Sequence, residues 1–148
     1  MYQRILIATD GSELSDKGLQ QGLALAARLG ANVDIVTVSE PWAMGMYDAM
    51  GWSVGYEATP EYRQDRENGA QKILAPALAA AAAAGVTAHG CHVLDRYAAE
   101  GIIDIATAHQ CDLIVMTSHG RRGMSRVLLG SQTAEVLAHS HVPVLVIR

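Results

Sequence analysis

Short runs of aliphatic and β-branched residues alternate with longer helical segments along the whole chain, and this alternation limits the possible folds. The five runs expected to be strands are Ile5 to Thr9, Val33 to Val38, Val86 to Val93, Leu113 to Thr117 and Val144 to Ile147. Four of them are continuous enough to be buried on both faces. The order βαβαβαβαβ therefore predicts a parallel sheet with right-handed crossovers and helices on both faces.

The first helical segment carries one stripe of small and apolar residues at helical spacing. The stripe consists of Leu14, Gly18, Gly22, Leu25 and Leu29. Gly30 follows it and is expected to end the helix, as glycines commonly do after a last turn. We expect the two glycines of the stripe to let this helix approach the sheet closely.

Three further helices are expected. The second has Thr59 as its N-cap and Pro60 at its first position, and it runs through an alanine block to Gly85. Pro76 lies inside it, and because an interior proline costs about 3 kcal/mol or more, we expect a kink or a break just before it, near residues 74–75. The third and fourth helices are expected at residues 98–109 and 131–138.

Composition favours one compact domain over residues 1–148. Half of the 148 residues are hydrophobic and the formal charge is −4, a balance that argues against disorder and against a basic nucleic-acid interface. No apolar stretch reaches the roughly 20 residues of a membrane span, and the N-terminus lacks a signal-peptide pattern, so we expect a soluble, cytoplasmic protein. Cys91 and Cys111 are expected to be buried free thiols.

Residues 39–58 are too many for an ordinary connection between a strand and a helix. They hold four of the seven aromatic residues, namely Trp42, Tyr47, Trp52 and Tyr56. A flap over a ligand, a patch buried against a partner subunit and a loop packed on its own domain are all compatible with this composition.

Polar loops follow the first and fourth expected strands. Ligands of open parallel sheets bind beyond the carboxyl ends of the strands, where the strand order reverses. If both loops build one site, their strands are neighbours, and the order 3-2-1-4-5 follows. Gly130 and Ser131 begin a helix and suit a phosphate, Gly120 permits a second close approach, and Arg121, with Arg122 and Arg126, adds positive charge or lies in solvent.

Asp10, at the end of the first strand, has two possible roles. Its carboxylate can accept hydrogen bonds from a ribose hydroxyl or a base amino group, or it can form an Asx turn with Ser12. The sequence alone supports both roles equally.

Other nucleotide, metal and catalytic motifs are missing. The sequence has neither GxxxxGK[ST] nor GxGxxG, which excludes a P-loop NTPase and argues against an ordinary dinucleotide fold. On a strand, His89 and Cys91 share one face and His92 points to the other, and no second cluster completes a metal site. We predict no catalytic residue and no metal-ligating residue.

Four segments together resemble the universal stress protein family in its single-domain form across nearly the whole chain: ILIATDGS, DLIVMTSHGRRG, LLGSQTAEVL and VPVLVIR. The family's ATP-binding signature is glycine, two residues, glycine, nine residues, then glycine followed by serine or threonine. Gly120 and Gly130-Ser131 match its second and third parts, and Thr117 replaces the first glycine. The Cβ of Thr117 narrows the space for a ligand there, or its hydroxyl donates to the ligand.

The resemblance implies a Rossmann-like sheet that binds ATP, ADP or AMP with Mg²⁺ or a similar divalent ion. The residues it implies at the base and ribose are Ala8, Thr9, Asp10, Val38, Met116 and Thr117. Those it implies at the phosphates are Gly120, Arg121, Gly130, Ser131, Gln132 and Thr133.

The resemblance also implies a homodimer through the last strand, Val142 to Ile147, whose apolar edge needs a partner. The favoured function is then a nucleotide-binding stress-response regulator with an unknown downstream partner. A nucleotide-independent dimeric interaction protein is the alternative, and a slow ATPase is a third, weaker one.

Overall fold

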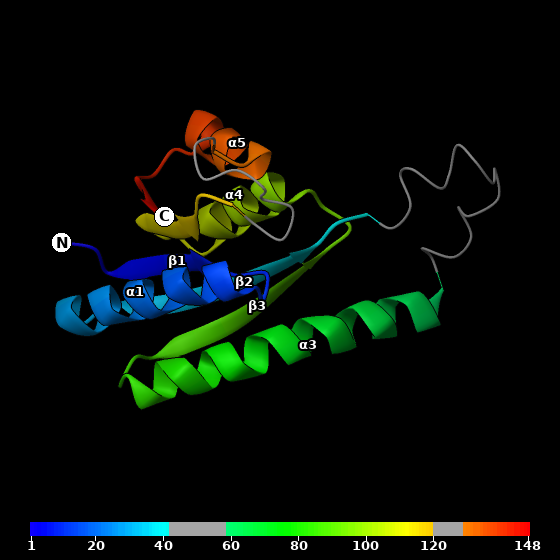
Figure 1. Cartoon of the computed structure of the whole chain (residues 1–148), viewed down its shortest axis with the longest axis horizontal. Coiled ribbons are helices and arrows are strands. Elements are labelled where there is room, and N and C mark those ends of the chain that lie inside the picture. The colour runs from blue at the N-terminus through cyan, green and yellow to red at the C-terminus, as the bar shows by residue number, and fades with distance from the viewer. Residues whose placement is uncertain (42–58, 120–128) are drawn as a thin grey trace.

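The computed structural model describes residues 1–41, 59–119 and 129–148 (Figure 1). Their elements, in chain order, are β1 (Arg4–Ala8), α1 (Glu13–Leu29), β2 (Asn32–Ser39), α3 (Pro60–Ala83), β3 (Ala88–Leu94), α4 (Ala98–Ala108), β4 (Leu113–Thr117), α5 (Ser131–His139) and β5 (Val144–Ile147). The five predicted strands and four predicted helices are confirmed, with shifts of a residue or two at several ends. The aromatic segment 42–58 lies outside the described residues.

The strands form one parallel sheet in the order β3-β2-β1-β4-β5, as predicted. β1 lies at the centre, where Ile5 pairs with Val33 of β2 on one side and with Leu113 of β4 on the other. The carboxyl ends of β1 and β4 are therefore adjacent.

Helices cover both faces of this sheet. One buried cluster joins α1 and α3 to one face, and it includes Ile7, Leu23 and Leu74. A second joins α4 and α5 to the other face, and it includes Ile102 and Val136. In Figure 1, α3 lies below the sheet and α4 and α5 above it.

Burial differs between the middle and the edges of the sheet. β1, β2 and β4 are mostly buried, whereas β3 and β5 keep half-buried and exposed positions along their length. Four strands were expected to be buried on both faces, but three of the described strands are mostly buried, because the strand order places β3 and β5 at the two edges.

Helix α1 packs closely on the sheet through its glycines, as predicted. A Cβ on Gly18 would lie 2.8 Å from Thr117 Cγ2, and one on Gly22 would lie 2.7 Å from Ile7 Cδ1. The helix ends at Gly30, which adopts a left-handed conformation with φ 66°. The stripe thus brings the start of α1 against the end of β4.

Helix α3 begins as predicted, with Thr59 accepting a hydrogen bond from Tyr62 N–H and Pro60 in its first turn. The predicted break at Pro76 does not occur, because α3 is continuous from Pro60 to Ala83. Pro76 removes the partner of the Lys72 carbonyl, but both residues lie on the exposed side of the helix, where solvent can replace that bond.

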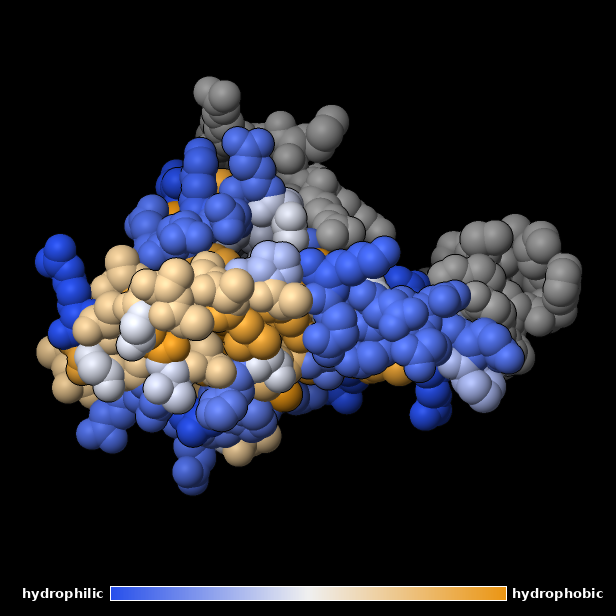
Figure 2. Space-filling view, turned by 90° about the horizontal axis from the view of Figure 1, so that it is seen from below, coloured by the Kyte–Doolittle hydropathy of each residue, from blue (hydrophilic) through white to orange (hydrophobic). Residues whose placement is uncertain are grey.

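The exposed side of α3 changes character along its length. Figure 2 shows hydrophilic side chains over its first half and mostly hydrophobic ones over its second half, where the sequence is rich in alanine. None of the described helices is long and apolar enough to cross a membrane.

Candidate functional site

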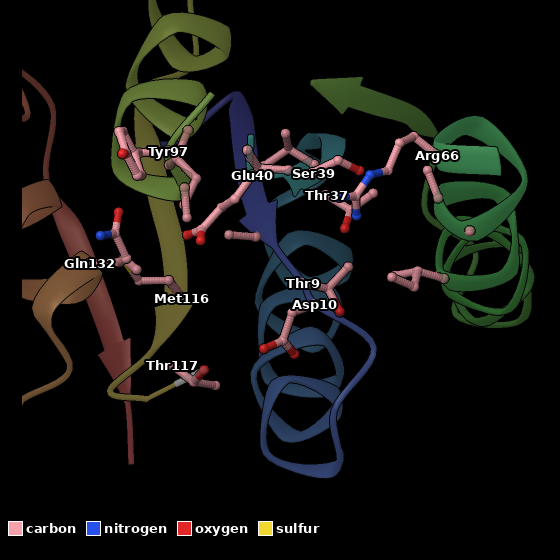
Figure 3. Close-up of a pocket in the computed structure, with 18 of the residues that line it drawn as sticks. Thr9, Asp10, Thr37, Ser39, Glu40, Arg66, Tyr97, Met116, Thr117 and Gln132 are labelled. Carbon is pink, nitrogen blue, oxygen red and sulfur yellow. The ribbon is translucent and has the colours of Figure 1, made fainter. Parts of the chain in front are cut away.

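A cavity of about 960 Å³ crosses the carboxyl ends of β1, β2 and β4 (Figure 3). One wall is the start of α5 together with the first turn of α4, and the opposite wall is the first half of α3. Figure 3 shows Thr9 and Asp10 between Gln132 and Thr117 on one side and Arg66 of α3 on the other. The cavity therefore lies at the point where the strand order reverses, as the sequence predicts.

The end of β1 is held by a short network of hydrogen bonds. Thr9 N–H donates to the Val36 carbonyl at 2.9 Å, and the Thr9 hydroxyl lies 3.1 Å from that of Ser15. Asp10 Oδ1 accepts from Ser12 N–H at 2.9 Å, which is the predicted Asx turn. Because Asp10 also lines the cavity, the turn presents its carboxylate to a ligand instead of excluding that role.

Thr117, which stands in place of the family's first glycine, ties the end of β4 to its surroundings. Its hydroxyl donates to the His119 carbonyl at 2.8 Å, and its carbonyl accepts from the Thr133 hydroxyl at 2.9 Å. Its Cγ2 lies against Gly18 of α1. The hydroxyl therefore holds His119, two residues after the end of β4, and the absence of a side chain at Gly18 makes room for the threonine.

The first turn of α5 faces the cavity. Gly130 N–H donates to the Ser118 carbonyl at 2.7 Å, and a Cβ on Gly130 would lie 3.1 Å from the same oxygen. Among the described residues, no side chain caps this helix start. Its backbone N–H groups and the positive end of its dipole are thus available to an anion.

Gln132 braces this turn. Its Oε1 accepts from the Ala99 N–H of α4 at 2.8 Å, so the side chain caps α4 from the neighbouring helix. The position of α5 over the cavity is therefore fixed by α4 as well as by the sheet.

Ten of the twelve residues that the sequence places at the site line the cavity. They are Ala8, Thr9, Asp10, Val38, Met116, Thr117, Gly130, Ser131, Gln132 and Thr133. Gly120 and Arg121 lie outside the described residues.

The cavity also has a wall that the sequence reasoning did not find. Helix α3 contributes Asp65, Arg66, Gly69 and Lys72, and the Arg66 guanidinium lies 5.2 Å from the centre of the Tyr62 ring. Arg66, Gly69 and Lys72 are three residues apart and Asp65 is four before Gly69, so the sequence spacing indicates one helix face. The spacing does not indicate that this face lines a cavity.

The sequence profile of the universal stress protein family matches residues 1–148. The chain belongs to the universal stress protein family. A universal stress protein of Thermus aquaticus is 32% identical over 148 residues, and the match covers 100% of both chains.

Solved structures of other universal stress proteins share this fold. One in complex with cAMP matches with a TM-score of 0.69 at 24% identity, covering 99% of this chain and 97% of that chain. One from Archaeoglobus fulgidus in complex with dAMP matches with a TM-score of 0.72 at 19% identity, covering 99% and 98%. In this universal stress protein, Thr117 and Gly130-Ser131 lie at one side of the cavity, joined through Thr133.

Proposed function

We propose that this universal stress protein binds an adenine nucleotide, with ATP the favoured one, in the cavity at the carboxyl ends of the strands. The observation that carries the proposal is the open first turn of α5, which shares one cavity with the Asp10 carboxylate. Donors for an anion and an acceptor for hydroxyl or amino groups in one cavity match the two ends of a nucleotide. Binding of cAMP and dAMP by structures of the same family supports this assignment.

The phosphates would lie at the start of α5. Backbone N–H groups of Ser131 and Gln132 supply donors, and the Ser131 hydroxyl adds another. Gly130 keeps this turn close to the end of β4, since a Cβ there would lie 3.1 Å from the Ser118 carbonyl. Gly120 and Arg121, on the loop before this turn, complete the proposed phosphate site.

The base and ribose would lie over β1, β2 and β4. Val38 and Met116 offer apolar surface to the base, and both line the cavity. Asp10 would accept hydrogen bonds from the ribose hydroxyls. Its own bond from Ser12 N–H uses Oδ1 and holds the carboxylate in place.

The residues present also fit a nucleotide that carries Mg²⁺. Oxygen ligands suit this ion, and Asp10 and the hydroxyls of Thr9 and Ser131 all line the cavity. When bound, the ion would neutralise phosphate charge. The proposal assigns no general base for phosphate hydrolysis, so ATP would act as a signal or a stabilising ligand.

We also propose that the protein acts in the cytoplasm as a homodimer. β5 pairs with β4 along one of its sides and lies at the edge of the described sheet. Pairing of β5 with its copy about a two-fold axis would cover the edge formed by residues 142–147. A change at the dimer surface or in the aromatic segment on nucleotide binding would then reach a downstream partner.

The test begins with freshly purified protein. We denature it, identify any released nucleotide by chromatography, and titrate the nucleotide-free protein calorimetrically with Mg-ATP, ADP and AMP. Gly130→Val should weaken binding at least tenfold, because the branched side chain would crowd the Ser118 carbonyl and displace the start of α5. Unchanged affinity would reject the placement of the phosphates.

Asp10→Asn tests the other end of the site. Asparagine keeps Oδ1 as the acceptor for Ser12 N–H, so the turn survives while the negative charge is lost. Affinity should fall about three- to tenfold. Asp104→Asn, which removes an exposed carboxylate of α4 outside the cavity, is the matched control and should leave affinity unchanged.

The alternative is a nucleotide-independent dimeric interaction protein, and Thr117 is the residue that favours it, because it replaces a signature glycine. The structure favours retained binding, since the Thr117 hydroxyl is already bonded to His119 and its methyl packs against Gly18. Absence of both released and titrated nucleotide would favour the alternative.

A further inference from the structure

A second polar cluster lies on the α4 and α5 face of the sheet, apart from the cavity. At its centre is Asp34 of β2, whose side chain is completely buried. Arg4 Nε lies 2.6 Å from Asp34 Oδ2, His109 Nδ1 lies 3.2 Å from Oδ1, and Cys111 Sγ donates to Oδ2 at 3.6 Å. Cys91 Sγ lies 4.0 Å from His109 Nδ1. None of these residues lines the nucleotide cavity.

Three residues of this cluster, including the buried aspartate, offer ligand atoms for a metal ion. One ligand atom each from Asp34, Cys91 and His109 lies within 4.8 Å of the other two. They come from β2, β3 and the end of α4, so the sheet and a packed helix hold them. Each of these three residue types is an established zinc ligand.

We propose that Asp34, Cys91 and His109 form a binding site for a divalent transition metal, with Zn²⁺ as the best-matched ion. Zinc bonds of about 2.0–2.3 Å place tetrahedral ligand atoms about 3.3–3.6 Å apart. The observed nitrogen–oxygen separation is 3.2 Å and the sulfur–nitrogen separation is 4.0 Å. Both are within about half an ångström of that geometry, and the sulfur–oxygen separation is at most 4.8 Å, so side-chain movements of about an ångström would complete the site.

Arg4 and Cys111 fit beside such a metal. Arg4 Nε and Cys111 Sγ both contact Oδ2 of the carboxylate, which leaves Oδ1, beside His109, for the ion. The 3.3 Å contact from Arg4 Nη2 to Oδ1 and the contact from His109 Nδ1 to Oδ1 both yield to the ion, and the proton of the neutral His109 ring is then carried on Nε2. Arg4 is 36% exposed, so its guanidinium can move into solvent.

Charge and access also agree with a divalent ion. Binding replaces the thiol proton of Cys91, which is released to solvent, and the ion then neutralises one thiolate and one carboxylate. His109 is 34% exposed and gives the ion a route from solvent. Three protein ligands leave a fourth position for water, as in zinc sites that are not purely structural.

A disulfide between the two cysteines does not fit the fold. Cys91 lies on β3 and Cys111 lies two residues before β4, and β2 and β1 separate these two strands, whereas bridged cysteines have Cα atoms about 4.4–6.8 Å apart. Cys91 and Cys111 therefore approach Asp34 from opposite sides, and only Cys91 is a proposed ligand.

The test uses the full chain after treatment with a chelator. Zn²⁺ is titrated in competition with a chromophoric chelator, and Co²⁺ is added separately as a spectroscopic probe. We expect one equivalent of metal and a thiolate-to-cobalt charge-transfer band. Cys91→Ser should abolish the band and weaken Zn²⁺ binding at least tenfold. His109→Ala should also weaken Zn²⁺ binding at least tenfold.

Two controls share the neighbourhood of the site. Cys111→Ala removes the other thiol and should keep the band, and His89→Ala removes the exposed histidine in register with Asp34 on β3 and should keep affinity. Arg4→Gln should bind Zn²⁺ more tightly, because it removes a competing cation. Circular dichroism checks that each metal-free variant is folded.

No binding by the wild-type protein at micromolar Zn²⁺ would overturn the proposal. A band that survives Cys91→Ser or disappears in Cys111→Ala would overturn it as well. These results are independent of nucleotide binding, since no ligand proposed for the metal lines the nucleotide cavity.

Discussion

At the scale of single residues, Cys111 shows how strongly one buried carboxylate acts on its neighbour. Burial, followed by the charge of Asp34 and the hydrogen bond to it, raises the pKa of the Cys111 thiol to about 12. Burial also tends to raise the pKa of Asp34, but hydrogen bonds from Arg4 and His109 outweigh it, and the net pKa is below its ordinary value. The carboxylate stays charged and the thiol stays protonated.

Cys111 is therefore expected to be an unreactive thiol. In a Cys91→Ser background, where it is the sole cysteine, its alkylation by iodoacetamide at pH 8 should be at least a hundredfold slower in the folded protein than in urea. The reason is that the thiolate is the reactive form, and a pKa near 12 leaves very little of it. Equal rates in the two states, followed by mass spectrometry, would contradict this.

Residues differ in how far the sequence predicts them. The sequence predicts the place of Asp10 because it follows the first expected strand, and the place of Gly130 because it precedes the last expected helix. The place of Arg66 is not predicted, because its role depends on where α3 crosses the sheet. His109 and Asp34 meet across 75 residues of sequence, and no local pattern reports such a contact.

At the scale of elements, α1 is positioned by the glycines that face the sheet. A Cβ on Gly22 would lie 2.7 Å from Ile7 Cδ1 and 3.3 Å from Val115 Cγ1, and both of these core residues are fully buried. A helical glycine with open space around it provides the comparison, since at Gly69 of α3 no atom lies within 4 Å of the added Cβ.

Gly22→Ala is expected to destabilise the protein by about 1–2 kcal/mol, because overpacking outweighs the gain in helix propensity. Gly69→Ala should instead stabilise it by about 0.5–1 kcal/mol, because only the propensity changes. Urea denaturation of the two variants measures both free energies of unfolding. A stabilising Gly22→Ala would show that α1 does not depend on this close approach.

The sequence predicted the helix ends better than it predicted the effect of a residue inside a helix. Caps such as Thr59 and Gly30 are local, and both were predicted correctly. Of the kink or break predicted at Pro76, the break was wrong and the kink stays a prediction, because whether a lost hydrogen bond breaks a helix depends on whether solvent can reach the freed carbonyl. That depends on which side of α3 faces the sheet.

At the scale of the whole molecule, the free edge of the sheet determines how two copies could meet. Leu145 on β5 and Leu29 at the end of α1 are each 39% exposed, but only Leu145 lies on an edge strand. If β5 forms the dimer interface, Leu145→Lys should give a monomer at micromolar concentration in light scattering. Leu29→Lys, with the same exposure, should remain a dimer. A wild-type monomer would refute the dimer prediction.

The strand order was predicted from chemistry rather than from periodicity. Polar loops after β1 and β4 required those strands to be neighbours, and the structure confirms that they are. The sequence could not give the depth of the cavity or its α3 wall, which depend on the packing of elements far apart in the chain. That residues 1–148 form a single domain stays a prediction.

The central place of β1 has a consequence for how this protein is made. One side of β1 pairs with β2, which follows within about 30 residues, but the other side pairs with β4, with Ile5 opposite Leu113. While a ribosome synthesises the chain, β1 must wait for more than a hundred residues before its second neighbour exists. The nascent chain thus carries an open, aggregation-prone strand edge while the residues between β1 and β4 are made, and chaperones that shield such edges have a defined interval in which to act.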